Sequence, residues 1–176
     1  MTVDEAQRSE ALVAGAGDVT FSNMLQTVLE PGYRLACGML NDPQAAEDAV
    51  QEAAIKAWRK LDQLREREAL RPWFLSIVAN ECRNVRRSRW RSVLKWAYVQ
   101  GPAVDSADSA LRGFAIREAL RSLDRRTRLV LVLRWYLDLP LEEIAVITHS
   151  SSHAVESRLY RGLDLMRRRM EASDAE

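Results

Sequence analysis

The stretch from Leu139 to Met170 has the pattern of two helices separated by a polar break. Apolar and small residues recur at helical spacing in its first part and again, after an interruption, in its second part. The first set is Leu141, Ile144, Ala145 and Thr148, and the second is Val155, Leu159, Gly162 and Met166. Between them lies His149-Ser150-Ser151-Ser152, which is typical of a turn that leads into a helix N-cap. This part of the chain is therefore predicted to fold as two helices that cross at a tight turn.

The turn and the outer side of the second helix favour a helix-turn-helix over an ordinary helical hairpin. Ala145 and Val155 suit a close helix crossing, because one is small and the other is branched. His149 is expected to have a positive φ, which histidine adopts more readily than most non-glycine residues. In this motif the second helix enters the major groove of DNA. The predicted DNA-contacting residues are His153, Ala154, Glu156, Ser157, Arg158, Tyr160 and Arg161. A helical hairpin without a DNA-binding role is the alternative.

The composition favours a soluble protein of one or two small domains. Of the 176 residues, 47% are hydrophobic and 29% are charged, and charges interrupt every apolar run, so no membrane insertion is expected. The N-terminal residues lack the basic-then-apolar order of a signal peptide. Cys37 and Cys82 are too few and too far apart to indicate a disulfide framework, which makes a reducing cytoplasm the expected location.

The net charge of +1 conceals an uneven distribution along the chain. Residues 1–64 hold five Lys and Arg against ten Asp and Glu, whereas residues 65–96 hold nine against three. An acidic segment beside a concentrated basic segment indicates two different partners, one of them a polyanion.

The acidic segment contains two predicted helices after a polar leader over residues 1–18. The first runs from Val19 to Leu40, and Pro31-Gly32 is expected to kink or divide it. The second begins at Asn41-Asp42-Pro43, with Asp42 as the N-cap, and runs to about Leu61. One side of this second helix is rich in alanine. The opposite side carries a polar face made of Glu47, Asp48, Gln51 and Glu52.

The basic segment contains a helix predicted from about Ala69 to Arg91. Phe74, Val78 and Cys82 fall at helical spacing and are expected in the core. A polar stripe follows the other side, and arginine can neutralise phosphates while asparagine and aromatic residues can contact bases. The stripe consists of Asn80, Arg83, Asn84, Arg87, Trp90 and Arg91. Five arginines from Arg83 to Arg91 exceed what capping of the helix dipole requires, so the stripe favours nucleic-acid binding.

Residues 97–112 lose hydrophobic periodicity and gain Gly, Pro, Asp and Ser, which is typical of a linker. Beyond it, one helix is predicted from Ile116 to Leu123 and another from Arg125 to Tyr136, capped by Asp124. The predicted fold class is therefore all-α. Two small helical domains, over residues 19–96 and 113–172, are joined by a flexible linker.

These motifs, in this order, resemble the extracytoplasmic-function group of bacterial RNA polymerase sigma factors, which keep regions 2 and 4 of the larger family. The sequence Ala46 to Glu52 with Ala57-Trp58, and the run from Trp73 to Arg87, are similar to region 2. The sequences Arg128 to Leu131, Glu142 to Ala145 and Val155 to Arg161 are similar to region 4.

The resemblance implies a non-enzymatic specificity subunit that needs no cofactor and acts in the bacterial cytoplasm, at the nucleoid when in holoenzyme. Its expected partners are the clamp and flap regions of RNA polymerase core and promoter DNA. An anti-sigma protein is a further candidate partner. On this basis the face from Glu47 to Glu52 binds core, the stripe from Asn80 to Arg91 reads and melts the −10 element, and the helix after His149 reads the −35 element.

Parts of the sequence are also consistent with two other functions. A helix-turn-helix transcriptional regulator with an N-terminal partner-binding domain accounts for residues 113–170 but leaves the stripe from Asn80 to Arg91 without a role. A metal site could use His149 and His153, which have the i, i+4 spacing of a zinc pair. That spacing requires one continuous helix, and Ser150-Ser151-Ser152 is expected to break it, so no metal site is predicted.

Overall fold

The computed structural model describes residues 3–64, 66–89 and 116–173, and for residues 3–20, 67, 86–89, 172 and 173 it describes the backbone alone. Every regular element in these described ranges is helical, which confirms the predicted all-α class. The elements are α1 (Val3–Leu40), α2 (Pro43–Arg59), η1 (Leu61–Gln63), η2 (Arg67–Ala69), α3 (Leu70–Arg89), a helix over residues 116–122, α5 (Arg125–Leu131), η3 (Val132–Tyr136), α6 (Leu141–Thr148) and α7 (Ser152–Ser173). The predicted linker, residues 97–112, lies outside the described residues. None of the described helices is long and apolar enough to span a bilayer.

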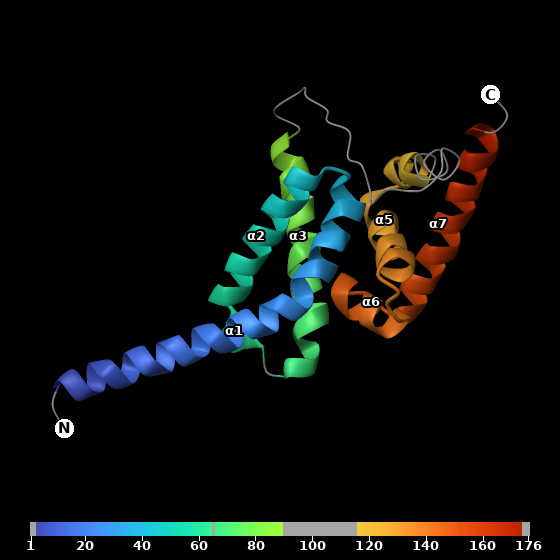
Figure 1. Ribbon diagram of the computed structural model, residues 1–176. Helices are drawn as coiled ribbons and strands as arrows, with labels where there is room; N and C mark the ends of the chain where they lie inside the picture. The colour runs from blue at the N-terminus through green and yellow to red at the C-terminus, as the bar shows by residue number, and fades with distance from the viewer. Residues whose placement is uncertain (1–2, 65, 90–115, 174–176) are drawn as a thin grey trace, which may run out of the picture.

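The first domain is a bundle of α1, α2 and α3 (Figure 1). Asp42 accepts a hydrogen bond from the Ala45 backbone N–H at 3.0 Å, and Pro43 occupies the first turn, so α2 begins as predicted. Alanines on one side of α2 let it lie close to its neighbours. The centre of the bundle is filled by Leu35 and by Phe74, Leu75 and Val78 of α3, all of which are fully buried.

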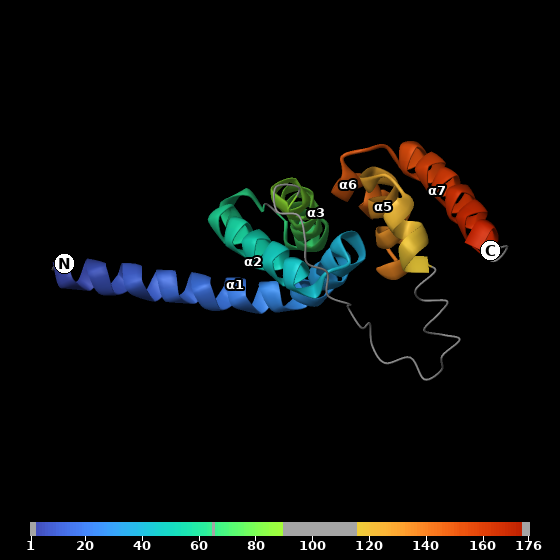
Figure 2. The ribbon, with the colours of Figure 1, turned by 90° about the horizontal axis from the view of Figure 1, so that it is seen from above.

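Pro31-Gly32 does not divide α1, which is continuous across Pro31. Figure 1 shows instead that α1 changes direction in its C-terminal half. Gly32 has a packing role, since a Cβ placed there would lie 2.8 Å from Cε1 of Phe74. Gly32 therefore lets α1 pack closely against α3. Residues 3–18, which belong to the segment expected as a polar leader, form the first turns of α1 and project away from the other helices (Figure 2).

The second domain contains the helix over residues 116–122, α5 with its π-helical continuation η3, α6 and α7. The sequence predicted a single α-helix from Arg125 to Tyr136, but its last turn widens into the π-helix η3. Asp124 caps α5 as predicted by accepting hydrogen bonds from the backbone N–H groups of Arg126 and Thr127 at 2.9 and 3.1 Å.

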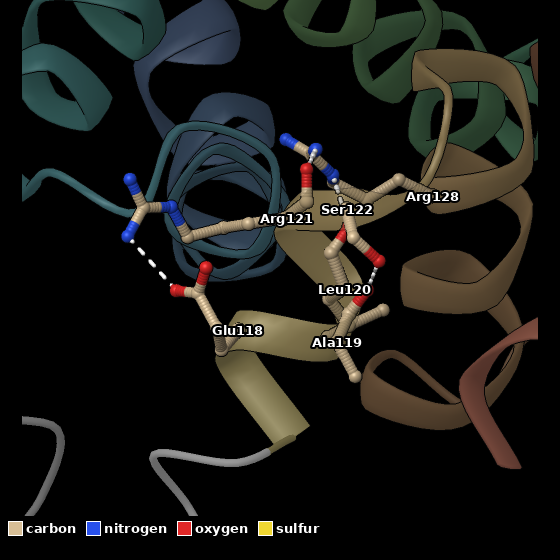
Figure 3. Close-up of polar contacts among 6 residues, drawn as sticks. All are labelled: Glu118, Ala119, Leu120, Arg121, Ser122 and Arg128. Carbon is tan, nitrogen blue, oxygen red and sulfur yellow. Dashed lines mark hydrogen bonds and ion pairs between the residues drawn. The ribbon is translucent and has the colours of Figure 1, made fainter. Parts of the chain in front are cut away.

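The buried side chain of Arg128 in α5 forms hydrogen bonds with backbone carbonyls of the second domain (Figure 3). Only 4% of this arginine is exposed. Its Nε donates to the carbonyl of Leu120 at 2.8 Å, and one terminal nitrogen donates to the carbonyls of Arg121 and Leu123 at 2.6 and 3.1 Å. The guanidinium thus satisfies the carbonyls at the end of the helix over residues 116–122, where positive charge is favoured by the helix dipole.

The two domains pack against each other and share one continuous hydrophobic core. The other terminal nitrogen of Arg128 donates to the carbonyl of Met39 in α1 at 3.1 Å. α6 packs on α3, where Arg71 and Glu143 form an ion pair at 3.3 Å. A Cβ on Gly38 of α1 would lie 2.8 Å from Cγ1 of Val132 in η3. We call this set of contacts between α1 or α3 and the second domain the interdomain interface.

Candidate nucleic-acid interface

The turn between α6 and α7 has the geometry of a helix-turn-helix. His149 lies in the left-handed region with φ 50° and ψ 48°, which confirms the prediction that this residue takes the positive φ of the turn. The Ser150 backbone N–H donates to the Ala145 carbonyl at 2.9 Å, and the Ser151 hydroxyl accepts from the Ala154 N–H at 3.2 Å. These hydrogen bonds satisfy a backbone carbonyl near the end of α6 and a backbone N–H near the start of α7. They thereby fix the angle at which the two helices cross. Ala145 and Val155 are both buried at this crossing.

The same turn separates the two histidines. α6 ends at Thr148 and α7 begins at Ser152, so His149 and His153 do not share a helix. Their imidazoles therefore do not lie on one helical face. This agrees with the helix break predicted at Ser150-Ser151-Ser152. Within the part of the chain that the structure describes, no group of three His, Cys, Asp or Glu side chains could hold a metal ion.

α7 presents one face to the core and another to solvent. Val155, Leu159 and Gly162 are buried against the domain. Among the predicted DNA contacts, Tyr160 is 68% exposed, whereas the remaining six divide into two groups. His153, Glu156 and Arg161 are also exposed, and Ala154, Ser157 and Arg158 are half-buried. The Nε of Arg161 donates to the Ser157 carbonyl at 3.2 Å, which lays the guanidinium along the exposed side of the helix.

Arg158 lies in a different environment from the other predicted contacts. It is half-buried, and its positive charge acts on Asp124 at the start of α5. Burial would raise the pKa of Asp124, but hydrogen bonds from the side chain and backbone of Thr127 and from the Arg126 backbone outweigh it, and the charge of Arg158 adds to them. The net result is a lowered pKa. Arg158 therefore interacts with the N-cap of α5 in addition to the DNA contact predicted for it.

The second candidate face lies on α3. Asn80 is half-buried and Arg83 and Asn84 are exposed, and the Arg83 guanidinium donates to Oδ1 of Asn80. The structure thus brings together three of the six predicted members of the stripe. Arg87 lies in the last part of α3, where only the backbone is described, and Trp90 and Arg91 lie outside the described residues.

Glu81 lies at the buried edge of this face and was not predicted from the sequence to have a role there. Its carboxylate oxygen Oε2 accepts a hydrogen bond at 2.6 Å from Nζ of Lys56 in α2, and the residue is only 7% exposed. The signal for it was an acidic residue within a run of cations, which needs a partner when it is buried. The identity of that partner could not be derived from spacing, because Lys56 lies on another helix.

The third candidate face lies on α2. Glu47, Asp48, Gln51 and Glu52 are all exposed, whereas Ala46, Ala49, Ala53 and Ala57 on the other side are buried. The structure therefore places the four predicted core-binding residues together on one solvent-facing side of a helix.

Comparisons with known proteins match both domains to one family. The profile described as sigma-70 region 2 matches residues 24–92, and the profile described as sigma-70, region 4, matches residues 113–166. RNA polymerase sigma factor SigV of Bacillus subtilis is 32% identical over 143 residues, which covers 81% of this chain and 86% of SigV. The ECF RNA polymerase sigma factor SigL of Mycobacterium tuberculosis is 27% identical over 141 residues, covering 77% of this chain and 80% of SigL.

Two solved structures share the fold. Sigma factor RpoE, in complex with the anti-sigma factor NepR from Bartonella quintana, superimposes with a TM-score of 0.72 at 24% identity, covering 86% of this chain and 97% of RpoE. CnrH, in complex with the cytosolic domain of CnrY, superimposes with a TM-score of 0.69 at 21% identity, covering 92% of this chain and 94% of CnrH.

Proposed function

Because this chain belongs to the extracytoplasmic-function group of the sigma-70 family, we propose that its three polar faces carry out the three binding steps of a sigma factor. The protein binds RNA polymerase core and directs transcription initiation from specific promoters. We assign core binding to the face of α2, −10 recognition and melting to the face of α3, and −35 recognition to the exposed face of α7. In this role the chain is a specificity subunit without catalytic chemistry, and it acts in the bacterial cytoplasm, where the polymerase is.

The observation that carries this proposal is the position of the region 4 match on a helix-turn-helix with an exposed outer face. α7 keeps Tyr160 and Arg161 in solvent while Val155 and Leu159 anchor it to α6 and α5. The rival function, a helix-turn-helix regulator with an unrelated partner-binding domain, is not favoured, since the N-terminal domain matches sigma-70 region 2.

The −35 assignment is tested by Arg161→Ala. An arginine that pairs with guanine in the major groove contributes about 1–3 kcal/mol of discrimination at that base pair. We expect the variant in holoenzyme to lose its preference at one position of the −35 element and to keep it at the others. Binding to a panel of −35 variants at two salt concentrations measures this.

Arg121→Ala is the matched control, because Arg121 is an exposed arginine of the same domain that pairs with Glu118 away from α7. It should leave the −35 profile unchanged. If Arg161→Ala also leaves the profile unchanged, α7 does not read bases through Arg161, and the assignment of this face is wrong.

The core-binding assignment is tested by Asp48→Arg combined with Gln51→Ala. Both side chains are exposed, so the changes should leave the fold intact and weaken association with core polymerase. The control is Glu30→Arg combined with Gln26→Ala, which likewise replaces an acidic residue by arginine and a glutamine by alanine, on the exposed side of α1. Equal retention of core polymerase by both double variants in a pull-down would contradict the assignment of the α2 face.

An anti-sigma protein is a further proposed partner, since the solved relatives RpoE and CnrH are each held in a complex, RpoE with the anti-sigma factor NepR. Such a protein should co-purify with a tagged form of this chain. It should also reduce the amount of core polymerase that the chain retains. A co-purifying protein that leaves core binding unchanged would not be an anti-sigma factor.

A further inference from the structure

Glu81 is a buried acid beside the surface of α3 that is proposed to meet DNA. It follows Asn80 directly and precedes Asn84 by one turn of α3. An unpaired carboxylate here would repel phosphates and would be costly to bury. Lys56 removes both problems, since its Nζ lies 2.6 Å from Oε2 of Glu81 while 39% of the lysine side chain remains exposed. The ion pair also connects α2, which carries the proposed core-binding face, to α3.

The same oxygen of Glu81 orients the amide of Asn84. Nδ2 of Asn84 lies 3.5 Å from Oε2 of Glu81 and donates to it. An ionised carboxylate can only accept hydrogen bonds, so it selects the NH₂ end of the amide and excludes the carbonyl end. The Oδ1 of Asn84 consequently lies on the side turned away from Glu81. Because Asn84 is exposed, this acceptor is available to a ligand on the α3 face.

Asn80 is oriented in the opposite sense. Its Oδ1 accepts from the guanidinium of Arg83, which can only donate. The NH₂ group of Asn80 therefore lies on the side turned away from Arg83. Two asparagines one turn apart thus differ in the group they leave for a partner, a donor from Asn80 and an acceptor from Asn84.

We propose that Glu81, held by Lys56, is a positioning residue for −10 recognition, and that it fixes Asn84 to accept a hydrogen bond from a base amino group. This inference rests on the −10 role proposed above for α3. On the edge that faces the major groove in a duplex, adenine and cytosine each present an amino donor where guanine and thymine present a carbonyl acceptor. If Asn84 meets this edge of a base, its fixed acceptor selects adenine or cytosine at one position of the −10 strand and disfavours guanine and thymine.

The test uses reconstituted holoenzyme and single-stranded −10 oligonucleotides that carry each of the four bases at each position. The unaltered protein should prefer adenine or cytosine at one position by about 2- to 12-fold, the range expected for one hydrogen bond. Asn84→Ala should abolish that preference. Glu81→Gln should relax it, because a glutamine side chain can accept from or donate to either end of the Asn84 amide.

Two double variants separate orientation from general damage. In the Asn84→Ala background, Glu81→Gln should change the base preference no further, since there is no amide left to orient. In the Glu81→Gln background, Asn84→Asp should restore the preference for amino bases, because a carboxylate is an acceptor in every orientation. Glu30→Gln in α1 is the matched control, since Glu30 also pairs with a cation but lies 70% exposed.

Core binding and the melting temperature show whether each variant is folded. If Glu81→Gln does not fold, Lys56→Gln takes its place. It removes the ion pair with Glu81 by a change in α2 and should relax the same base preference. Retention of the preference in Asn84→Ala would overturn the −10 role of Asn84 itself. Loss of the preference in Asn84→Ala, but full retention in folded Glu81→Gln or Lys56→Gln, would overturn only the positioning role of Glu81.

Discussion

Asp124 stabilises the second domain through a cap that titrates. Its carboxylate accepts hydrogen bonds from two backbone N–H groups and, at 2.5 Å, from the hydroxyl of Thr127. Loss of such an N-cap costs about 1 kcal/mol, so Asp124→Ala should lower the free energy of unfolding by that amount at pH 7. Urea denaturation followed by circular dichroism measures the change. Asp164→Ala on α7 is the control, since Asp164 only forms a surface ion pair with Arg168 and its loss should have little effect.

The lowered pKa of Asp124 predicts how this contribution varies with pH. A carboxyl group whose pKa is lower in the folded state than in the unfolded state stabilises the fold fully above the unfolded value. The stabilisation is lost as the pH falls through the folded pKa, which lies below the ordinary value of 3.8. The difference in stability between the unaltered protein and Asp124→Asn should therefore be constant near neutrality and shrink below about pH 4. A difference that grew on acidification would contradict the assignment of the cap.

At the scale of elements, Gly162 sets how closely α7 approaches α5. A Cβ there would lie 2.7 Å from Cγ2 of Thr127 and 3.1 Å from Cδ1 of Leu131. Gly162→Ala gains helix propensity of about 1 kcal/mol, but overpacking of this kind costs about 1–3 kcal/mol, so we expect a net loss of stability. Arg167→Ala, an exposed change on the same helix, should be neutral. A more stable Gly162→Ala variant would show that α7 can move away without cost.

The elements also show which parts of the structure follow from the sequence. The helix-turn-helix was predictable down to the positive φ of His149, because local spacing and turn chemistry determine it. Both N-caps, Asp42 and Asp124, were predictable for the same reason. The role of Gly32 and the pairing of Lys56 with Glu81 depend on contacts between separate helices, about which periodicity within one helix carries no information.

At the scale of the whole molecule, Gly38 tests whether the interdomain interface persists in solution. A Cβ at this position would lie 2.8 and 3.0 Å from the two methyl groups of Val132. Gly38→Ala should therefore push η3 away from α1 and increase the radius of gyration measured by small-angle X-ray scattering. Val132→Ala in the same chain removes those methyl groups and should restore the smaller value. An unchanged radius in Gly38→Ala would mean that the two domains do not rest on each other in solution.

The interdomain interface bears on how this sigma factor competes for a shared enzyme. The −10 and −35 elements lie about 25 base pairs apart, roughly 85 Å along B-DNA, whereas a compact chain of 176 residues has a radius of gyration of only about 16 Å. Contacts such as those of Arg71 with Glu143 and of Arg128 with Met39 must therefore break before one molecule can occupy both elements. If only the open fraction binds polymerase productively, the apparent affinity falls in proportion to that fraction. In a cell where several sigma factors share one pool of core polymerase, a weaker interdomain interface would then increase the share of polymerase bound by this sigma factor. Transcription from the promoters that it recognises would rise accordingly.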